Sequence, residues 1–137
     1  VRIWNAADGA AVRTIELELA EGETPSAFYD VAISDNGQSV AAAGADKTIR
    51  LFNAANGQPG AVIDAADDTV YRLLFTAGGQ LLSIGHAGNL SLWNPANGEQ
   101  AYTAKAGGVA YSACASPTTK QVAVPAADGK TYLLTLP

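Results

Sequence analysis

Short apolar runs separated by turn-forming residues make up almost the whole chain. Each run is about five to nine residues long, and Gly, Asn, Asp or Pro recurs about every ten residues, as in strands joined by tight turns. No stretch combines apolar residues at helical spacing with capping residues at its ends. The pattern therefore predicts an all-β protein, an antiparallel meander with little or no helix.

One phrase recurs along the chain: an apolar run that ends in a large side chain, then Asn, then a turn that closes on Gly. The copies are VRIWNAADG (1–9), IRLFNAANG (49–57) and LSLWNPANG (90–98). The large residue is Trp4, Phe52 or Trp93, and Leu134 is a degenerate fourth. This spacing is a repeat of about 40 to 48 residues. The longer first interval contains the polar stretch 19–25, which we expect to be a surface loop.

Each unit contains more than the phrase. An apolar run with a Tyr near its start precedes a second run of small residues in all three units, at Tyr29, Tyr71 and Tyr111. Each unit is therefore predicted to contain four strands, which we call the outer, inner, second and third strands in chain order. We expect one domain over residues 1–137, with units at approximately 10–53, 58–94 and 99–137 and with residues 1–5 as the third strand of a preceding unit.

A period of about 40 to 45 residues with four strands is that of one WD40 propeller blade. VYRLLFTAGG (70–79) resembles the inner-strand phrase of the WD40 family, whereas VAAAGADKTIRLFN (40–53) and LLSIGHAGNLSLWN (81–94) resemble its second and third strands. The resemblance implies a partial β-propeller with about three four-stranded antiparallel blades and one extra strand. Because a ring needs about four to eight blades, we expect a C-terminal fragment of a larger propeller with open edges.

WD40 blades often link a loop His, a Ser or Thr on the second strand, a turn Asp and the Trp by hydrogen bonds. No copy here has the loop His, and each copy lacks at least one other member. By alignment, the Ser, Asp and Trp positions hold Ala42, Asp46 and Phe52 in the first copy and Ser83, Ala87 and Trp93 in the second. The last copy has Asp128 at the Asp position and Leu134 at the Trp position. A buried polar network is favourable only when its members are satisfied. We therefore expect degenerate repeats held together by apolar packing.

The recurring phrase is best explained as architecture. The Trp-type residue supplies apolar area between neighbouring blades. The Asn side chain at 5, 53 and 94 favours a turn, because it can bond its own backbone. The glycines that close the turns supply positive φ, at Gly9, Gly57 and Gly98.

Composition and charge exclude several classes of function. The eight Lys and Arg are scattered and the net charge is −5, so no nucleic-acid surface is expected. No apolar run is long enough to span a membrane. The chain contains no methionine. We expect the natural start of the gene product to lie outside it, so the sequence predicts no localisation.

Candidate chemistry is sparse. His86 is the only histidine, and without converging ligands we expect a solvated turn residue and no metal. Ser83 and His86 lack a nucleophile-elbow motif, and the glycine turns match no nucleotide-binding pattern. Cys114 is expected to be a small buried hydrophobe. The acidic loop residues are expected to be solvated rather than calcium ligands: Glu21, Glu23, Asp67 and Asp68. We expect no cofactor and no catalysis.

The three repeated tyrosines admit two interpretations. Their sequence neighbours Asp30, Arg72 and Ser112 vary while the tyrosines persist, which suits a partner-binding rim. The alternative, which we favour from the sequence, is that the rings pack between blades. The expected docking face would also carry Asp46, Lys47 and His86.

The resemblance implies a non-catalytic protein–protein interaction scaffold, whose protein partner the sequence does not identify. A second hypothesis is a self-assembling fragment that completes a propeller by oligomerisation through its open blade edges. A third is an accessory propeller of a bacterial enzyme or cytochrome c-like protein, because the Asp-Asn-Gly turn and the Ala-rich copies look like bacterial WD40 proteins.

Overall fold

Thirteen antiparallel strands in four sheets make up the computed structural model, which describes residues 1–17, 22, 26–65 and 68–137. The described residues contain no helix, so the predicted all-β class is confirmed. The predicted surface loop 19–25 and the acidic residues Glu21, Glu23 and Asp67 lie outside the described residues, apart from Gly22.

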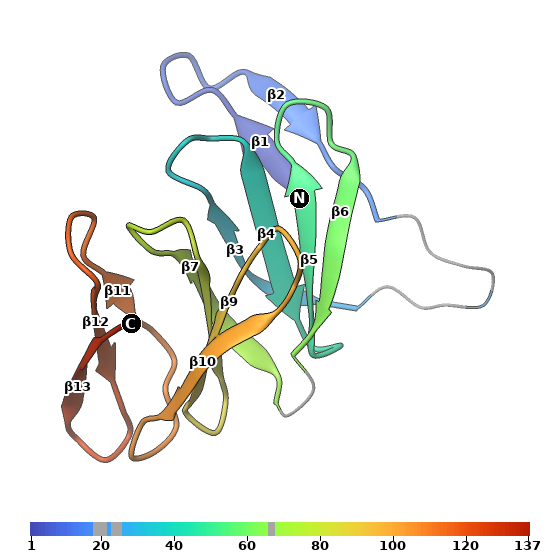
Figure 1. The fold of residues 1–137 in the computed structure, drawn as a ribbon. Helices are drawn as coiled ribbons and strands as arrows, with labels where there is room; N and C mark the ends of the chain where they lie inside the picture. The colour runs from blue at the N-terminus through green and yellow to red at the C-terminus, as the bar shows by residue number, and fades with distance from the viewer. Residues whose placement is uncertain (18–21, 23–25, 66–67) are drawn as a thin grey trace.

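The strands group into four successive sheets (Figure 1). The first sheet is β1 (Arg2–Trp4) and β2 (Ala11–Thr14). The second is β3 (Phe28–Ile33), β4 (Ser39–Gly44), β5 (Thr48–Asn53) and β6 (Pro59–Asp64). The third is β7 (Val70–Phe75), β8 (Leu81–Gly85), β9 (Asn89–Trp93) and β10 (Gln100–Lys105). The fourth is β11 (Cys114–Ala115), β12 (Gln121–Pro125) and β13 (Thr131–Thr135).

Each outer strand pairs with the third strand that precedes it in the chain. β2 therefore pairs with β1, β6 with β5 and β10 with β9. The described strands thus form two complete four-stranded sheets between a two-stranded and a three-stranded one, rather than three four-stranded blades and one extra strand. The predicted partial propeller is confirmed, with this grouping of its strands.

The recurring phrase forms the same turn three times. The Asn side chain accepts the N–H of the residue two positions later in each copy, at 2.9, 2.9 and 3.0 Å for Asn5, Asn53 and Asn94. The carbonyl of each Asn also accepts the N–H of the glycine four residues later at 2.8 Å. The glycine φ angles are +71°, +77° and +75° at Gly9, Gly57 and Gly98. Each turn leads from a third strand to an outer strand.

The core lies between the sheets, where apolar faces of neighbouring sheets meet. Ala41 and Ala43 of β4 share one buried cluster with the larger Leu73 and Leu81 of the next sheet. At the following junction leucines and an isoleucine of β8 and β9 meet alanines and valines: Leu82, Ile84, Leu90, Leu92, Ala110, Ala113, Val122 and Val124. Large and small side chains therefore fill each junction in turn.

Burial along the second strands follows from this arrangement. Every residue of β8, and every residue of β4 after Ser39, is buried, because sheets cover both faces of these strands. In β12 only Val122 and Val124 are buried. These two valines point toward the preceding sheet, while the opposite face of the strand is uncovered. A continuous apolar run thus marks a strand with two covered faces.

The two end sheets leave apolar residues exposed. Phe52 and Trp93 are 6% and 7% exposed, whereas Trp4, at the equivalent position, is 55% exposed. Trp93 packs toward the preceding sheet, and the described residues contain no sheet before β1 for Trp4 to contact. At the other end, Leu133 is 66% exposed.

The predicted burial of Cys114 is wrong. Its thiol is free and its side chain is exposed. Cys114 pairs with Ala123, which pairs with Leu133, so the three side chains share the face of the last sheet that no described sheet covers. Leu74, three residues after Tyr71 as Cys114 is after Tyr111, packs against the core cluster that includes Val122 and Val124 of the fourth sheet. Cys114 lies on an inner strand as predicted, but a residue there is buried only where a neighbouring sheet covers it.

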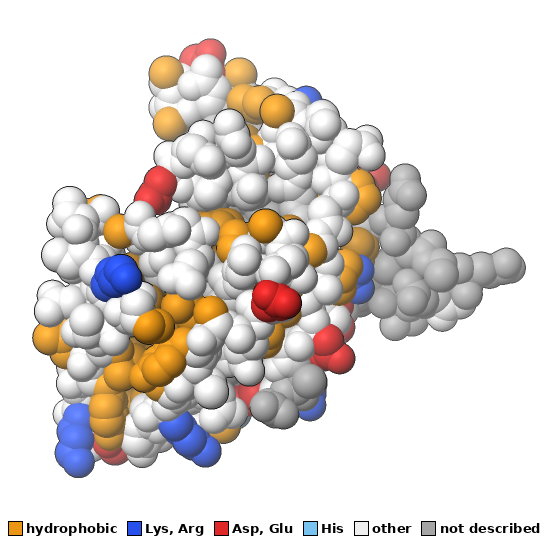
Figure 2. Space-filling model, in the orientation of Figure 1, with side chains coloured by type: hydrophobic (Ala, Val, Ile, Leu, Met, Phe, Trp, Pro, Cys, Tyr) orange, Lys and Arg blue, Asp and Glu red, His pale blue; other side chains and the backbone are white. Residues whose placement is uncertain are grey.

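A hydrophobic seam is also visible beside the last sheet. Figure 2 shows hydrophobic side chains gathered between β10 and β13. Three residues of these two strands are partly buried and pack against the core cluster: Ala104 of β10, and Tyr132 and Leu134 of β13. β13 has no neighbour on its other edge among the described strands. The seam is therefore open where the complete sheets carry an outer strand.

Candidate functional site

Four aromatic side chains form one cluster at the edge of the sheets where the inner strands begin. The rings of Tyr29 and Tyr71 are stacked, with centroids 5.2 Å apart and planes 6° from parallel. His86 lies 5.2 Å from Tyr71 and 6.0 Å from Tyr111. Tyr71 and Tyr111 meet edge to face at 6.0 Å. We call these four residues the aromatic cluster.

The cluster connects three successive sheets. Tyr29 lies on β3, Tyr71 on β7, and Tyr111 precedes β11, while His86 follows β8 in the turn to β9. Stacked and edge-to-face pairs each contribute about 0.5–1.5 kcal/mol beyond the burial of area. The rings nevertheless remain accessible, because Tyr29 is 48% and Tyr111 62% exposed. The cluster therefore combines packing between sheets with an exposed aromatic surface.

A β-bulge positions two of these tyrosines. The register of β3 with β4 shifts between Phe28 and Asp30, and the register of β7 with β8 shifts between Val70 and Arg72. Tyr29 and Tyr71 are thus the extra residues of their strands. A bulge re-aims a side chain relative to a regular strand. In β3 and β7 the Tyr is accordingly the residue that leaves the regular alternation.

Asp30, next to Tyr29, joins the second sheet to the third. Its carboxylate accepts the backbone N–H of Leu73 at 2.7 Å and lies 3.3 Å from the Arg72 guanidinium. The Asp30 side chain is only 13% exposed, whereas that of Arg72 is 41% exposed. Asp30 was predicted among varying rim residues, but its contacts are between sheets.

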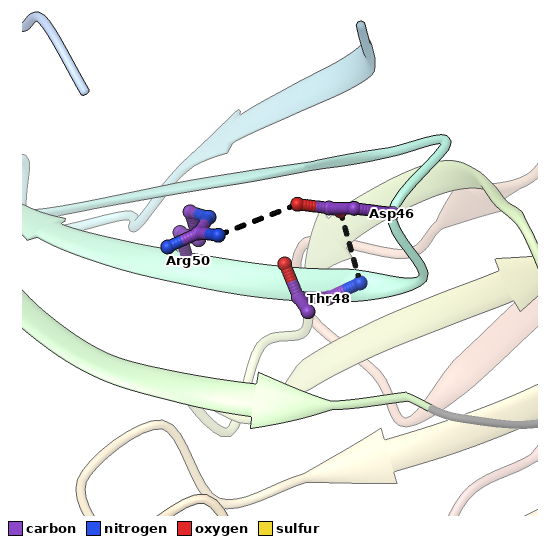
Figure 3. Close-up of polar contacts among 3 residues, drawn as sticks. All are labelled: Asp46, Thr48 and Arg50. Atoms are coloured by element: carbon purple, nitrogen blue, oxygen red, sulfur yellow. Dashed lines mark hydrogen bonds and ion pairs between the residues drawn. The ribbon is translucent and has the colours of Figure 1, made fainter. Parts of the chain in front are cut away.

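Asp46 closes the turn between β4 and β5 (Figure 3). Its carboxylate accepts the N–H of Thr48 at 3.1 Å and pairs with Arg50 at 3.4 Å. Lys47, which follows Asp46, has a positive φ of 61°, and its carbonyl accepts the N–H of Ala65. Asp46 and Lys47 therefore organise the turn and the end of β6. No ring contact joins either residue to the aromatic cluster.

Asp68 contradicts the expectation of a solvated loop charge. It is partly buried, and its carboxylate accepts the N–H of Ala87 in the β8–β9 turn and the N–H of Thr69 at 2.8 Å. Gly85 leaves room for this carboxylate, because a Cβ there would lie 2.9 Å from Asp68 atoms. Since Ala87 replaces the turn Asp in this copy, Asp68 ties the loop to the turn from the opposite side.

The sequence predicted apolar packing in place of the polar network of the family, but part of that network is present in the third sheet. The indole N–H of Trp93 donates to the hydroxyl of Ser83 at 2.8 Å, and both residues are buried. In the last sheet, the hydroxyl of Tyr132 donates to Asp128 at 2.6 Å. That bond and the N–H of Lys130 lower the pKa of Asp128. The same Asp128 bond raises the pKa of Tyr132.

The aromatic cluster presents three phenol rings and one imidazole ring. No group of three or more His, Cys, Asp or Glu side chains that could hold a metal occurs among the described residues. In the same residues no helix is long and apolar enough to cross a membrane. The hydroxyls of Tyr29, Tyr71 and Tyr111 make no hydrogen bond within the described chain. Amphipathic rings with free hydroxyls are the side chains favoured at protein interfaces.

The sequence indicated most of this site, although not all of its contacts. It placed the three tyrosines at equivalent positions and set His86 beside them on one face. It treated His86 as a solvated turn residue, whereas the exposed imidazole contacts two of the rings. Ser112 is exposed beside Tyr111. The contact of His86 could have been predicted from its position, because it lies in the turn after β8, which pairs with β7.

Comparisons with known proteins agree with this geometry. The sequence model of the WD40 repeat (WD domain, G-beta repeat) matches residues 18–53. Among curated protein sequences, none matches the chain. The chain is similar to the solved structure of U3-55K, with a TM-score of 0.83, 22% identity and coverage of 99% of this chain and 42% of that one. It is similar to the RRP9 WD40 repeats, with a TM-score of 0.82, 20% identity and the same two coverages.

The chain thus spans less than half the length of either solved structure. These likenesses show the fold of a partial WD40 propeller. Together with the match at residues 18–53, they support the WD40 β-propeller family that the repeat phrases predicted.

We expect Asp30→Ala to lower the free energy of unfolding by about 2–3 kcal/mol, because it leaves the buried N–H of Leu73 without an acceptor. Arg72→Ala removes only a partly exposed ion pair and should cost at most about 1 kcal/mol. Asp30→Asn keeps an acceptor oxygen and should fall between them. Urea unfolding followed by circular dichroism measures all three. Equal losses for Asp30→Ala and Arg72→Ala would contradict the role of Asp30 between sheets.

Proposed function

We propose that this chain is a non-catalytic protein-interaction scaffold and that a protein partner docks on the aromatic cluster. The observation that carries the proposal is that Tyr29 and Tyr111 are exposed while Tyr71 and His86 hold their rings in place. A binding surface gains most from aromatic anchors that are already ordered, because little side-chain entropy is then lost on association.

The surroundings of the cluster suit contact specificity. Arg72 is 41% exposed, and its charge is partly neutralised by Asp30. Ser112 is exposed beside Tyr111, and Lys47 is exposed in the neighbouring β4–β5 turn. Tyr and Arg are enriched among residues that contribute most to binding energy, while polar residues at the rim exclude water. The net charge of −5 and the scattered Lys and Arg do not favour nucleic acid as the partner.

We also propose that the uncovered faces of the end sheets are covered by further blades of a larger propeller. The support is that equivalent positions are buried where a neighbouring sheet exists and exposed where it does not, as Trp93 and Trp4 show. The alternative is a self-assembling structure in which copies of this chain cover one another. Both proposals explain Leu133 and Cys114 on the open face of the last sheet.

The partner proposal is tested by selecting peptide ligands for the chain from a displayed library and measuring their dissociation constants. We expect Tyr111→Ala and Tyr29→Ala each to weaken the selected ligands by at least about tenfold, as for interface anchors. Tyr102→Ala is the matched control, since Tyr102 is 38% exposed on β10 and outside the cluster. Ligands that respond to Tyr102→Ala and ignore both cluster variants would refute docking on the cluster.

Light scattering over a concentration series separates the larger propeller from self-assembly. The larger propeller predicts open-ended association of the isolated chain that Leu133→Asp reduces, because an uncovered apolar face pairs without closing a ring. Val62→Asp is the control, since Val62 is 57% exposed on β6 of a complete sheet. A single discrete oligomer that Leu133→Asp dissociates would instead establish self-assembly.

A further inference from the structure

A polar cavity opens between the second and the third sheet. It has a volume of about 360 Å³, which is within the range of small-ligand pockets. None of the described residues that line it is Lys, Arg or His. Its walls carry carboxylates, an amide, hydroxyls and an indole: Asp64, Asp68, Asn89, Ser91, Thr103 and Trp93. A cleft lined by charges of one sign concentrates ligands of the opposite sign, so this cavity is suited to a cation that also donates hydrogen bonds.

The second sheet has a guanidinium at the equivalent place. Arg50 of β5 lies two residues before Phe52, as Ser91 of β9 lies two residues before Trp93. Figure 3 shows the Arg50 guanidinium turned toward the carboxylate of Asp46, and the two groups are 3.4 Å apart. The repeat itself therefore shows that an Arg side chain fits beside a carboxylate at this position of a sheet.

The third sheet keeps the carboxylate but lacks the guanidinium. Ala87 replaces Asp46 in the turn, and Asp68 supplies a carboxylate to the same turn by accepting the N–H of Ala87. Asp68 also lines the cavity, together with Ser91 at the position of Arg50. Within the described chain Asp68 forms no ion pair. The carboxylate of Asp68 thus lies beside a space that corresponds to the place of a guanidinium in the second sheet.

The cavity also reaches further into the third sheet than its counterpart reaches into the second. The counterpart lies between the segment after β2 and the second sheet, and it is lined by Arg50 and Phe52 of β5 but by no residue of β4. The cavity at the third sheet is lined in addition by Ser83 and Gly85 of β8, the strand equivalent to β4. The exchange of Arg for Ser therefore leaves space open as far as the second strand.

The walls offer acceptors that suit a planar group with several N–H donors. The side chains of Asn89 and Thr103 make no hydrogen bond within the described chain, so their oxygens are free to accept. Trp93 adds an aromatic surface to the wall. A guanidinium carries five N–H donors in one plane and stacks on aromatic rings, whereas an ammonium is a compact and more strongly hydrated charge. The cavity therefore fits a guanidinium better than an amine.

We propose that this cavity binds the guanidinium group of a ligand, paired with Asp68 as Arg50 is paired with Asp46. A free arginine-like compound and an arginine side chain of another protein both present this group. The walls belong to the second and third sheets and the segment between them, so no further blade is needed to form the cavity. No member of the aromatic cluster lines it, so this inference does not depend on a partner at that cluster.

The probe is N-acetyl-L-arginine amide, titrated into the full chain by calorimetry. We expect saturable binding. The citrulline counterpart, which has the same length but a neutral urea group, should bind at least about tenfold more weakly, because charge-assisted hydrogen bonds are about twice as strong as neutral ones. The lysine counterpart should also bind more weakly. Absence of saturable binding, or equal affinity for the citrulline or the lysine compound, would overturn the proposal.

Free L-arginine separates the two sources of the group. Tighter binding of the free amino acid than of the blocked probe assigns the cavity to a small molecule. Tighter binding of the blocked probe, whose ends resemble peptide bonds, assigns it to an arginine side chain of a polypeptide. Either result supports a guanidinium as the ligand group.

Two variants of the chain locate the binding. Ser91→Arg supplies the chain's own guanidinium at the position of Arg50 and should abolish binding, while circular dichroism shows the sheets intact. Asp68→Asn should weaken the arginine probe by at least about tenfold. Asp35→Asn is the matched control, because it removes the same charge from an exposed turn outside the cavity and should change the dissociation constant by less than about twofold. Binding that survives Ser91→Arg, or that Asp35→Asn weakens as much as Asp68→Asn does, overturns the proposal.

Discussion

Face-to-face packing between successive sheets is the interaction on which the rest of this structure depends. No sheet here encloses a core by itself, and the three buried clusters all lie at junctions between sheets. Burying a large aliphatic or aromatic side chain contributes about 1.5–3 kcal/mol. A face gains that energy only when the neighbouring sheet is present, as the buried Phe52 and Trp93 and the exposed Trp4 demonstrate.

The same constraint builds the candidate site. Bulges at Tyr29 and Tyr71 release these side chains from the pleat, so that the rings stack across the junction rather than within a sheet. Asp30 fixes the same junction through the N–H of Leu73. An exposed surface is thus held rigid by contacts that belong to the fold. Rigid aromatic side chains on a scaffold are well suited to binding, so the proposed site and the architecture share residues.

The repeat made the fold predictable from the sequence. Three copies of one phrase and the spacing of the tyrosines were enough to predict the strands, because each strand carries its own local pattern. Burial at the ends was less predictable. Cys114 was expected to be buried because it aligns with Ala32 and Leu74 on the inner strands of the other units. Its burial, however, depends on a neighbouring sheet that the described chain does not supply. The contact of Asp68 was also not predicted, because its carboxylate meets the N–H of Ala87 only once the chain is folded.

Hydrogen exchange of the backbone amides, measured strand by strand, tests most directly whether packing between sheets holds the structure together. The account predicts the slowest exchange in β4, β5, β8 and β9, whose sheets are covered on both faces, and faster exchange in β1, β2 and β11. Equal protection of β1–β2 and of β8–β9 would contradict it, because hydrogen bonding within each sheet would then be sufficient for stability.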